Sequence, residues 1–368
     1  MCRASEIGCH DDEDNGFKAD PPYRVDQPLL DRSLTPSYTR AVKLGRREFS
    51  ATVALGLHIL ARRASAQGSA KPPRVGYLGS RNPRSTKAFF DGLQEQGYVR
   101  GQNFLLEFRA PERPDKYEEF PGLAAQLVAA GVDVILAATP SAIEATTRAT
   151  RTIPIVGVDL ESDPVAKGWA ASLAHPGGNF TGFVLDIPEM SGKQLQFLKE
   201  VKPDLSRVAV FGDPRVNELQ WKATEAAARG AGLTIQALSV RDVGEVPGAI
   251  AEAARQRAGA LVVLTSPLVF NNLGRITEAA VKHRIPAICP FAPAFADAGG
   301  LIAYGPDLPD LYRRAAGYVG RILKGAKAGD LPVQRLDKFQ LVVNLKTARA
   351  LHLTLPQSLV LRADHVID

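Results

Sequence analysis

The stretch Val132-Asp133-Val134-Ile135-Leu136-Ala137-Ala138-Thr139-Pro140-Ser141-Ala142 constrains the fold more than any other part of this sequence. It begins with a continuous apolar run, which is typical of a strand buried on both faces of a parallel sheet. Thr139, Pro140 and Ser141 then supply capping hydroxyls and a proline suited to the first helical turn, which predicts a helix over residues 141–150. The stretch therefore predicts a helix that begins where a parallel strand ends.

A turn of this kind offers free N–H groups and the positive end of a helix dipole, both of which suit a carboxylate or a phosphate. We expect the hydroxyls of Thr139 and Ser141, with the N–H groups of Ser141 and Ala142, to hold a ligand carboxylate. Pro140 has no N–H group, and its role would be to fix the turn. The competing interpretation is an ordinary capped turn in which Thr139 only stabilises the helix.

The alternation of strand and helix runs through most of the chain. Short apolar strands alternate with amphipathic helices over residues 74–185, and the pattern restarts over residues 188–343. Repeated units of this kind form parallel sheets with helices on both faces. The sequence therefore predicts an α/β protein with two doubly wound parallel-sheet lobes. We expect lobe 1 over residues 72–186 with part of 306–334, and lobe 2 over residues 187–305 with part of 335–368.

The amino-terminal 66 residues differ from the rest of the chain. Residues 1–43 are polar, carry an acidic run at residues 11–14, and have no apolar periodicity, so we interpret them as a disordered extension or as the product of a start codon assigned too early. Residues 44–66 contain a basic segment, a short apolar segment and an Ala-Ser-Ala site, which together predict a signal peptide for the twin-arginine or Sec route. A short amphipathic helix is the alternative.

The composition argues against several classes of function. The chain has 368 residues, a formal charge of +6 and no basic run, so nucleic acid is not an expected partner. Among its cysteines, Cys2 and Cys9 precede the cleavage site, which leaves Cys289 alone and predicts no internal disulfide. Cys289 lies on an apolar strand and is expected in the core.

Chemistry-bearing motifs are also absent from the sequence after residue 66. It contains no Gly-x-Ser-x-Gly, no P-loop and no dinucleotide fingerprint, and its histidines have no metal-ligand spacing. Asp159, Glu161 and Asp163 provide carboxylates for a divalent cation, but no further oxygen cluster accompanies them. We therefore expect no catalytic residue, no metal and no cofactor.

Several short pieces of the sequence occur together in one known family. They are Arg46-Arg47-Glu48-Phe49, Val75-Gly76-Tyr77-Leu78-Gly79-Ser80, Gly97-Tyr98, Gly101-Gln102-Asn103, Thr139-Pro140-Ser141-Ala142, Ile153-Pro154-Ile155-Val156, Asp163-Pro164-Val165, Pro176-Gly177-Gly178-Asn179-Phe180-Thr181-Gly182, Gly299-Gly300-Leu301, Tyr304-Gly305, Tyr318-Val319-Gly320-Arg321-Ile322-Leu323-Lys324-Gly325, Leu331-Pro332-Val333 and Asn344-Leu345-Lys346-Thr347-Ala348. In these pieces the chain resembles the solute-binding proteins of one ABC-transporter family, the group that includes tryptophan- and tyrosine-type binding proteins.

The resemblance implies a type I periplasmic-binding fold, with hinge strands that cross between the lobes. It also implies a monomer in the periplasm that captures a small solute and delivers it to a membrane permease with its ATPase. The leader, which begins near residue 44 rather than at the amino terminus, departs from the family pattern. Residues 161–162 vary in type across the family, so the resemblance does not carry over the identity of the ligand.

Ligands of doubly wound sheets bind beyond the carboxyl ends of the strands. That rule selects the following candidate ligand residues: Ser80, Arg81, Asn82, Thr139, Pro140, Ser141, Ala142 and Asp163 in lobe 1, Asp213, Ser266 and Phe291 in lobe 2, and Tyr304 at the return crossing. They combine hydroxyls, a helix amino end, carboxylates and aromatic rings, which suits a small carboxylated solute that is aromatic or amino-acid-like. We expect the lobes to close around it by hinge motion.

Three other functions fit part of this pattern. A periplasmic sensing module that feeds a signalling receptor would use the same fold. A doubly wound enzyme would need a nucleophile–base pair or a cofactor fingerprint, and a ligand-responsive repressor would need an amino-terminal helix-turn-helix. Neighbouring genes for a permease and an ATPase would separate the transport component from the sensor.

Overall fold

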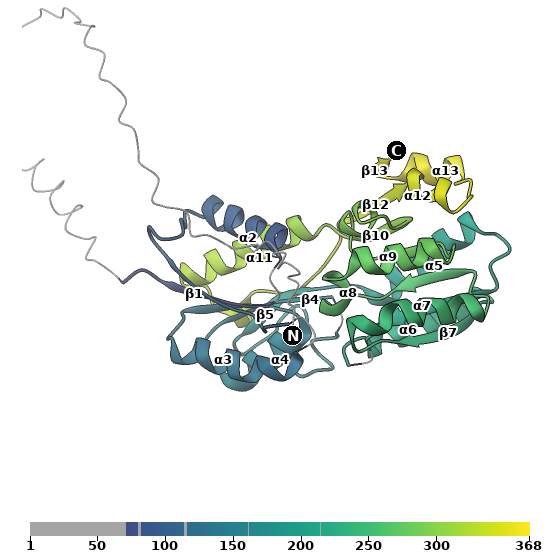
Figure 1. Cartoon of the computed structure of the whole chain (residues 1–368). Coiled ribbons are helices and arrows are strands. Elements are labelled where there is room, and N and C mark those ends of the chain that lie inside the picture. Colours follow the sequence, from purple (N-terminus) through teal and green to yellow (C-terminus); the bar gives the residue numbers. More distant parts are fainter. Residues whose placement is uncertain (1–70, 80–81, 114–115, 161, 214) are drawn as a thin grey trace, which may run out of the picture. The chain divides into compact units, whose positions relative to one another are not determined.

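The structure is a computed structural model that describes residues 71–79, 82–113, 116–160, 162–213 and 215–368. The expected extension over residues 1–43 and the expected signal peptide over residues 44–66 lie outside these residues. The described chain forms two α/β lobes, each built around one sheet (Figure 1).

The sheet of lobe 1 has six strands in the order β11-β5-β4-β3-β1-β2, and all neighbours are parallel. Its strands are β1 (Arg74–Gly79), β2 (Leu105–Arg109), β3 (Val134–Ala138), β4 (Ile155–Asp159), β5 (Phe180–Val184) and β11 (Gln334–Arg335). Every residue of β3 is buried, which agrees with its continuous apolar run. By contrast β2 lies at the edge, and its residues are exposed or half-buried.

Helices cover both faces of this sheet (Figure 1). On one face lie α2 (Pro83–Glu95) and α11 (Leu308–Leu323), and on the other lie η1 (Tyr117–Glu119), α3 (Phe120–Ala129) and α4 (Pro140–Ala149), while η3 (Ala328–Asp330) follows α11 in the chain. Gly92 allows α2 and α11 to pack closely, because a Cβ atom there would lie 2.8 Å from the Cβ of Ala316. The chain thus returns to lobe 1 after building most of lobe 2.

The sheet of lobe 2 has seven strands in the order β13-β12-β10-β9-β8-β6-β7. They are β6 (Arg207–Gly212), β7 (Thr234–Ser239), β8 (Ala260–Val263), β9 (Ala287–Cys289), β10 (Ile302–Pro306), β12 (Phe339–Asn344) and β13 (His365–Ile367). All neighbours are parallel except β10 and β12, which are antiparallel. The predicted fold class of two doubly wound α/β lobes is confirmed, with one antiparallel pair added to the second sheet.

The helices of lobe 2 again form two layers. One layer contains α5 (Ile187–Val201), α6 (Glu218–Gly230), α12 (Leu345–Ala350) and α13 (Gln357–Arg362), and the other contains η2 (Val243–Glu245), α7 (Val246–Arg255), α8 (Pro267–Phe270), α9 (Leu273–Lys282) and α10 (Ala294–Asp297). Buried side chains of the second layer join those under α2 and α11 in one continuous hydrophobic cluster.

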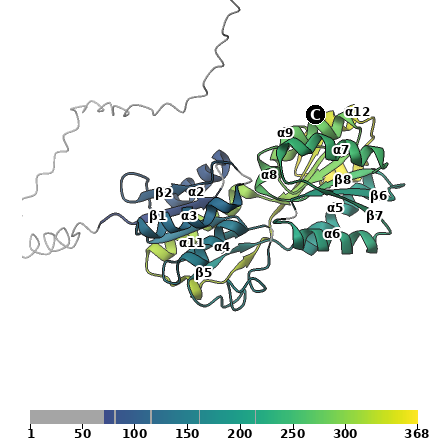
Figure 2. The same ribbon diagram turned by 60° about the horizontal axis from the view of Figure 1, so that its bottom comes forward.

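Three segments cross between the lobes in the described chain (Figure 2). They are residues 185–186 between β5 and α5, residue 307 between β10 and α11, and residues 336–338 between β11 and β12. The segments are tied together, since Arg335 pairs with Asp186 at 2.8 Å and the N–H of Leu336 donates to the carbonyl of Val184 at 2.9 Å. These crossings form the hinge region between the lobes.

Candidate ligand-binding site

A cavity of about 60 Å³ lies between the lobes, at the carboxyl ends of strands from both sheets. Its lining comprises Asn82, Ser85, Ala138, Thr139, Val158 and Leu160 after β1, β3 and β4, Ser266, Pro267, Phe270 and Phe291 after β8 and β9, and Leu308 and Tyr312 at the start of α11. None of these described lining residues carries a formal charge. Their polar side chains and their aromatic rings therefore decide what the cavity can hold.

The start of α2 supplies two of the polar side chains. Asn82 caps this helix, and its Oδ1 accepts hydrogen bonds from the N–H groups of Arg84 at 3.1 Å and Ser85 at 3.3 Å. Pro83 follows the cap, as the asymmetry of helix ends favours. Ser85 is 1% exposed, and within the described residues its hydroxyl makes no hydrogen bond. This hydroxyl is therefore available to a ligand in the cavity that Ser85 lines.

The start of α4 supplies Thr139, the residue on which the sequence prediction centred. Its Oγ1 accepts a hydrogen bond from the N–H of Ala142 at 3.2 Å, so Thr139 caps the helix. Its backbone has φ 153° and ψ 158°, a conformation that residues other than glycine rarely adopt. Strain of this kind costs of order 1–3 kcal/mol and is found preferentially at functional sites.

Ser266 is the polar side chain that lobe 2 contributes. It caps α8, accepts a hydrogen bond from the N–H of Val269 at 3.1 Å, and is 1% exposed. As caps, the hydroxyls of Ser266 and Thr139 act as acceptors, which leaves their hydrogens free to be donated. The cavity thus has hydroxyl donors on two opposite walls.

Aromatic and aliphatic side chains form the rest of the cavity. The rings of Phe270 and Phe291 meet edge to face, with centroids 4.8 Å apart and an interplanar angle of 82°. Leu160 and Tyr312 line the cavity from lobe 1. Edge-to-face and offset arrangements are also those in which a ligand ring would pack against these side chains.

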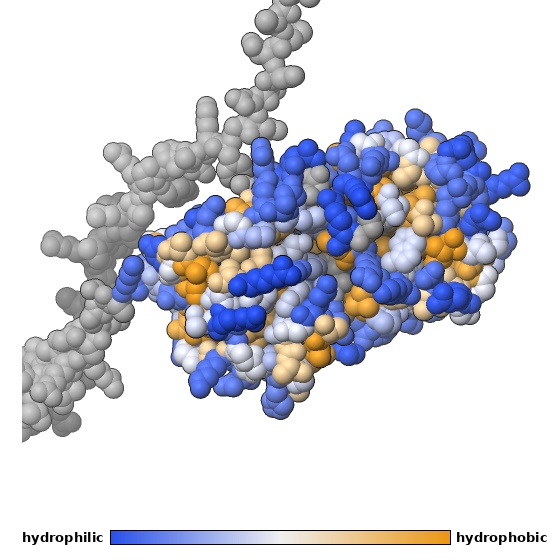
Figure 3. Space-filling model, turned by 90° about the horizontal axis from the view of Figure 1, so that it is seen from below, coloured by the Kyte–Doolittle hydropathy of each residue, from blue (hydrophilic) through white to orange (hydrophobic). Residues whose placement is uncertain are grey.

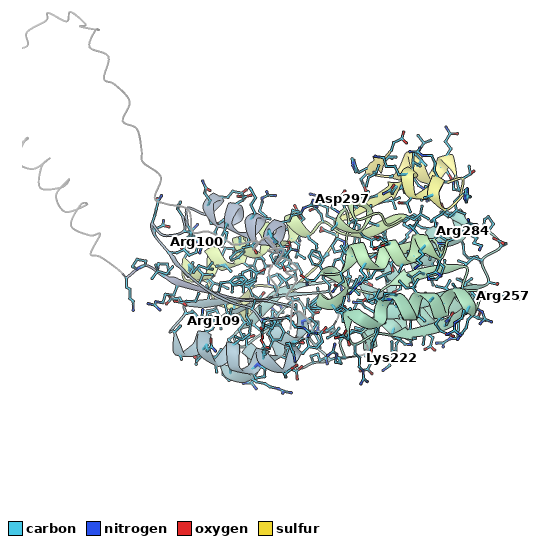
Figure 4. The ribbon with its side chains drawn as sticks, in the orientation of Figure 1. Arg100, Arg109, Lys222, Arg257, Arg284 and Asp297 are labelled. Carbon is cyan, nitrogen blue, oxygen red and sulfur yellow. The ribbon has the colours of Figure 1, made fainter. Side chains whose placement is uncertain are left out.

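Among the described residues no charged side chain lines the cavity, so the helix ends there set its electrostatics. Both α2 and α4 begin at the cavity, and so does α11, whose first residue is Leu308. The positive end of a helix dipole favours an anion. An ion pair between Arg84 and Asp297, 3.2 Å long, joins the lobes nearby, but both side chains are exposed and such pairs contribute little. Asp297 is labelled in Figure 4.

Two ionisable side chains are buried on strands that end close to residues lining the cavity. Burial raises the pKa of Tyr77, on β1, to about 12, and it raises the pKa of Cys289, on β9, to about 12. Both side chains are therefore uncharged at neutral pH. Cys289 is 0% exposed, which agrees with its expected place in the core.

The structure brings four of the sequence-predicted residues to this cavity: Asn82, Thr139, Ser266 and Phe291. Ser80 and Arg81 lie outside the described residues. Pro140, Ser141 and Asp163 instead line a neighbouring cavity of about 370 Å³, together with charged residues of α4 and α6. Ala142 is buried, and its N–H is engaged by Thr139.

The remaining two predicted residues contact protein groups. The carboxylate of Asp213 accepts hydrogen bonds from Tyr117 and Arg215, and the residue does not line the inter-lobe cavity. Tyr304 lies within β10, and its ring packs against the rings of Phe197 and Phe339. Neither side chain belongs to the cavity lining in this structure.

Sequence reasoning missed Ser85, Phe270, Leu308 and Tyr312. Ser85 lies three residues after the cap Asn82, so a closer reading of the first helical turn could have found it. Tyr312 lies in α11, and the sequence does not show that this helix begins at the cavity. Phe270 belongs to the four-residue α8, which is too short to leave a periodic signal.

The described residues offer neither a metal-binding cluster nor a membrane-spanning helix. They contain no group of three or more histidine, cysteine, aspartate or glutamate residues placed to hold a metal ion. They also contain no helix with the length and apolar character needed to cross a bilayer. The face seen from below in Figure 3 carries hydrophilic residues with hydrophobic patches among them.

Comparison with known proteins gives consistent matches. Residues 83–367 match the family described as ABC transporter substrate binding protein. A tyrosine-binding protein of Clostridioides difficile (strain R20291) is 26% identical over 270 residues, which cover 73% of this chain and 76% of that protein.

Solved structures extend these matches to the fold. A domain from Streptococcus pneumoniae in complex with L-Trp is 25% identical, has a TM-score of 0.74, and covers 81% of this chain and 100% of that one. A conserved domain protein from Vibrio cholerae is 23% identical and has a TM-score of 0.75, with 80% of this chain and 100% of that one covered. The latter likeness establishes the fold alone.

Proposed function

The chain belongs to the family of ABC transporter substrate-binding proteins, and from that premise we propose that it captures a small carboxylated solute, aromatic or amino-acid-like, in the inter-lobe cavity. The observation that carries the proposal is the pairing of hydroxyl donors with aromatic rings in one cavity. The named ligands of two relatives, tyrosine and L-Trp, support the same class of solute.

The polar side of the cavity supports an anionic group in the ligand. Ser85, Thr139 and Ser266 provide hydroxyl donors, and α2 and α4 point their amino ends at the same space. Hydroxyls and helix ends can hold a carboxylate without an arginine. A hydrogen bond to a charged group contributes about 1.5–3 kcal/mol, so each hydroxyl donor would raise the affinity for the ligand measurably.

The apolar side supports an aromatic or branched aliphatic group. Phe270, Phe291 and Tyr312 offer ring faces and edges, and Leu160 and Leu308 fill the space between them. A ligand ring that is removed from water here would gain about 25 cal/mol for each Å² of apolar surface buried.

The size of the cavity supports a hinge motion. Its volume of about 60 Å³ is well below the ~150 Å³ of a cavity that holds benzene. An aromatic solute would therefore enter while the lobes stand further apart, and the crossings at residues 185–186, 307 and 336–338 are the segments that would bend.

The family also supports a place for the protein in transport. We propose that it works as a monomer in the periplasm and delivers its solute to a permease with an ATPase in the inner membrane. The predicted signal over residues 44–66 would direct this export. Permease and ATPase genes beside this one would support the assignment, whereas a neighbouring receptor-kinase gene would favour the sensing role.

Isothermal titration calorimetry on a matched set of ligands tests the proposed solute. L-Tyrosine, L-tryptophan and L-phenylalanine should bind, and L-tyrosinamide, which lacks only the carboxylate charge, should bind at least about tenfold more weakly than L-tyrosine. A strong response to a sugar such as D-ribose, with no response to any amino acid or organic acid, would refute the proposal.

A further inference from the structure

A cluster of polar contacts joins the lobes at the side of the cleft away from the hinge region. The hydroxyl of Tyr117, in η1 of lobe 1, donates to Oδ2 of Asp213 in lobe 2 at 3.0 Å. The guanidinium of Arg215 lies over the ring of Tyr117, with its central carbon 4.5 Å from the ring centroid. We call Tyr117, Asp213 and Arg215 the clasp.

The order of the strands places the clasp opposite the hinge. The crossing segments extend from β5 and β11 at one edge of the first sheet, and from β10 and β12 in the second. Tyr117 follows β2, which lies at the other edge of the first sheet, and Asp213 follows β6, which lies beside the edge strand β7. The cavity lies after strands between these positions. A bond at the clasp therefore acts on the side of the cleft opposite the hinge region.

When the lobes separate, the buried carboxylate of Asp213 keeps Arg215 as its partner. Asp213 is 1% exposed, and its carboxylate is held within lobe 2 by Arg215, whose Nη2 lies 2.7 Å from Oδ2 and whose Nε lies 2.9 Å from Oδ1. The N–H of Arg215 also donates to Oδ1, at 2.9 Å. Closure adds the hydroxyl and the ring of Tyr117. Since an unpaired buried carboxylate is strongly destabilising, this arrangement makes the contact reversible.

A buried amide connects the clasp side of lobe 2 to the cavity. Gln220 is 0% exposed, its Nε2 donates to the carbonyl of Leu160 in lobe 1 at 3.0 Å, and its Oε1 accepts from the N–H of Thr265 at 2.9 Å. Leu160 lines the cavity, and Thr265 precedes the cavity residue Ser266. Gln220 therefore joins one cavity wall to the other without lining the cavity itself.

We propose that the clasp holds the cleft closed and slows the release of ligand, although none of its residues touches the cavity. Its members are positioning residues that raise affinity by stabilising the closed state. A second inter-lobe pair, Arg113 with Asp242 at 3.3 Å, lies near this side but is half exposed, so it contributes little by comparison. The inference does not depend on which solute is bound.

The fraction of closed molecules tests the proposal directly. Fluorophores on azido-amino acids introduced at the exposed Lys87 and Lys282 would report the separation of the lobes by single-molecule energy transfer, with the native cysteines untouched. Tyr117→Phe removes only the hydroxyl that reaches Asp213, a charged acceptor. We expect it to lower the closed-to-open ratio by about ten- to a hundredfold, in ligand-free protein and at saturating L-tyrosine. Tyr117→Leu, which also removes the ring beneath Arg215, should lower it further.

The matched control is Tyr318→Phe. The Tyr318 hydroxyl donates to the carbonyl of Pro332 at 2.8 Å within lobe 1, so its loss should reduce stability without moving the lobes. A closed-to-open ratio that is unchanged within twofold in Tyr117→Phe, or lowered equally in Tyr318→Phe, would overturn the clasp. If L-tyrosine leaves the wild-type distribution unchanged, the proposed ligand is wrong, and the ligand-free measurement still decides the clasp.

Discussion

Two turns face each other across the cavity, and they have nearly the same composition. In lobe 1 β3 leads through Thr139 and Pro140 into α4, and in lobe 2 β8 leads through Ser266 and Pro267 into α8. Each turn places a hydroxyl at the helix cap and a proline in the first turn. The same local chemistry therefore serves both lobes.

The backbones of the two turns differ. A residue before proline is restricted to an extended ψ, and both obey this rule, with ψ 158° at Thr139 and 160° at Ser266. Ser266 has φ −165°, which is ordinary extended backbone, whereas Thr139 has φ 153°. Of these two turns, only the one at Thr139 therefore has a strained backbone. The comparison indicates that the capping role, which both residues share, does not require the strain.

Removing both hydroxyls should have the largest effect and would test whether the two walls act together. We expect Thr139→Ala with Ser266→Ala to weaken L-tyrosine binding by roughly a hundredfold or more, because each hydroxyl donates to the same charged group. Each single variant should weaken binding by about tenfold, measured by calorimetry. Wild-type affinity in both single variants, with a lowered melting temperature, would show that the hydroxyls are caps and nothing more.

Substitution of glycine at the two cap positions would separate the effect of backbone strain from that of the lost cap. Glycine adopts positive φ without a steric penalty, and at a helix cap it costs only a few tenths of a kcal/mol relative to threonine or serine. We expect Thr139→Gly to raise the free energy of unfolding by about 1 kcal/mol while it weakens ligand binding. Ser266→Gly has no strain to relieve and should lower that free energy by a few tenths of a kcal/mol. Urea denaturation measures both, and changes of the same sign would contradict the asymmetry.

Much of the fold could be predicted because its signals are local. The apolar run before Thr139 is the buried strand β3, and α4 begins one residue before its predicted start. The place of Tyr304 was not anticipated correctly: the sequence analysis puts it at the return crossing, yet it lies inside β10, which runs to Pro306 because β12 pairs with it in an antiparallel register. That pairing joins residues more than thirty positions apart in sequence, and no local pattern encodes it.

The site was less predictable for the same reason. Thr139 and Ser266 could be found because a strand end, a hydroxyl and a proline occur together in the sequence. Tyr312 reaches the cavity only because α11 returns to lobe 1 after the crossing at residue 307. Asp213 was a reasonable ligand candidate at a strand end, but the sequence does not show that Tyr117 meets its carboxylate from the other lobe.

The smallest expected effect concerns a hydroxyl that has no counterpart in lobe 2. Ser141 follows Pro140 in the first turn, whereas Leu268 occupies the equivalent position after Pro267. The sequence hypothesis gives Ser141 a share of the ligand carboxylate, but in the structure it lines the neighbouring cavity with Glu144 and not the one with Ser266. From this placement we expect Ser141→Ala to change the affinity for L-tyrosine by less than about twofold, which corresponds to under ~0.5 kcal/mol. Calorimetry on Ser141→Ala and Thr139→Ala under the same conditions measures the two affinities. A tenfold loss in Ser141→Ala would mean that the ligand lies across the start of α4. The two turns would then differ in how they contact the ligand as well as in backbone strain.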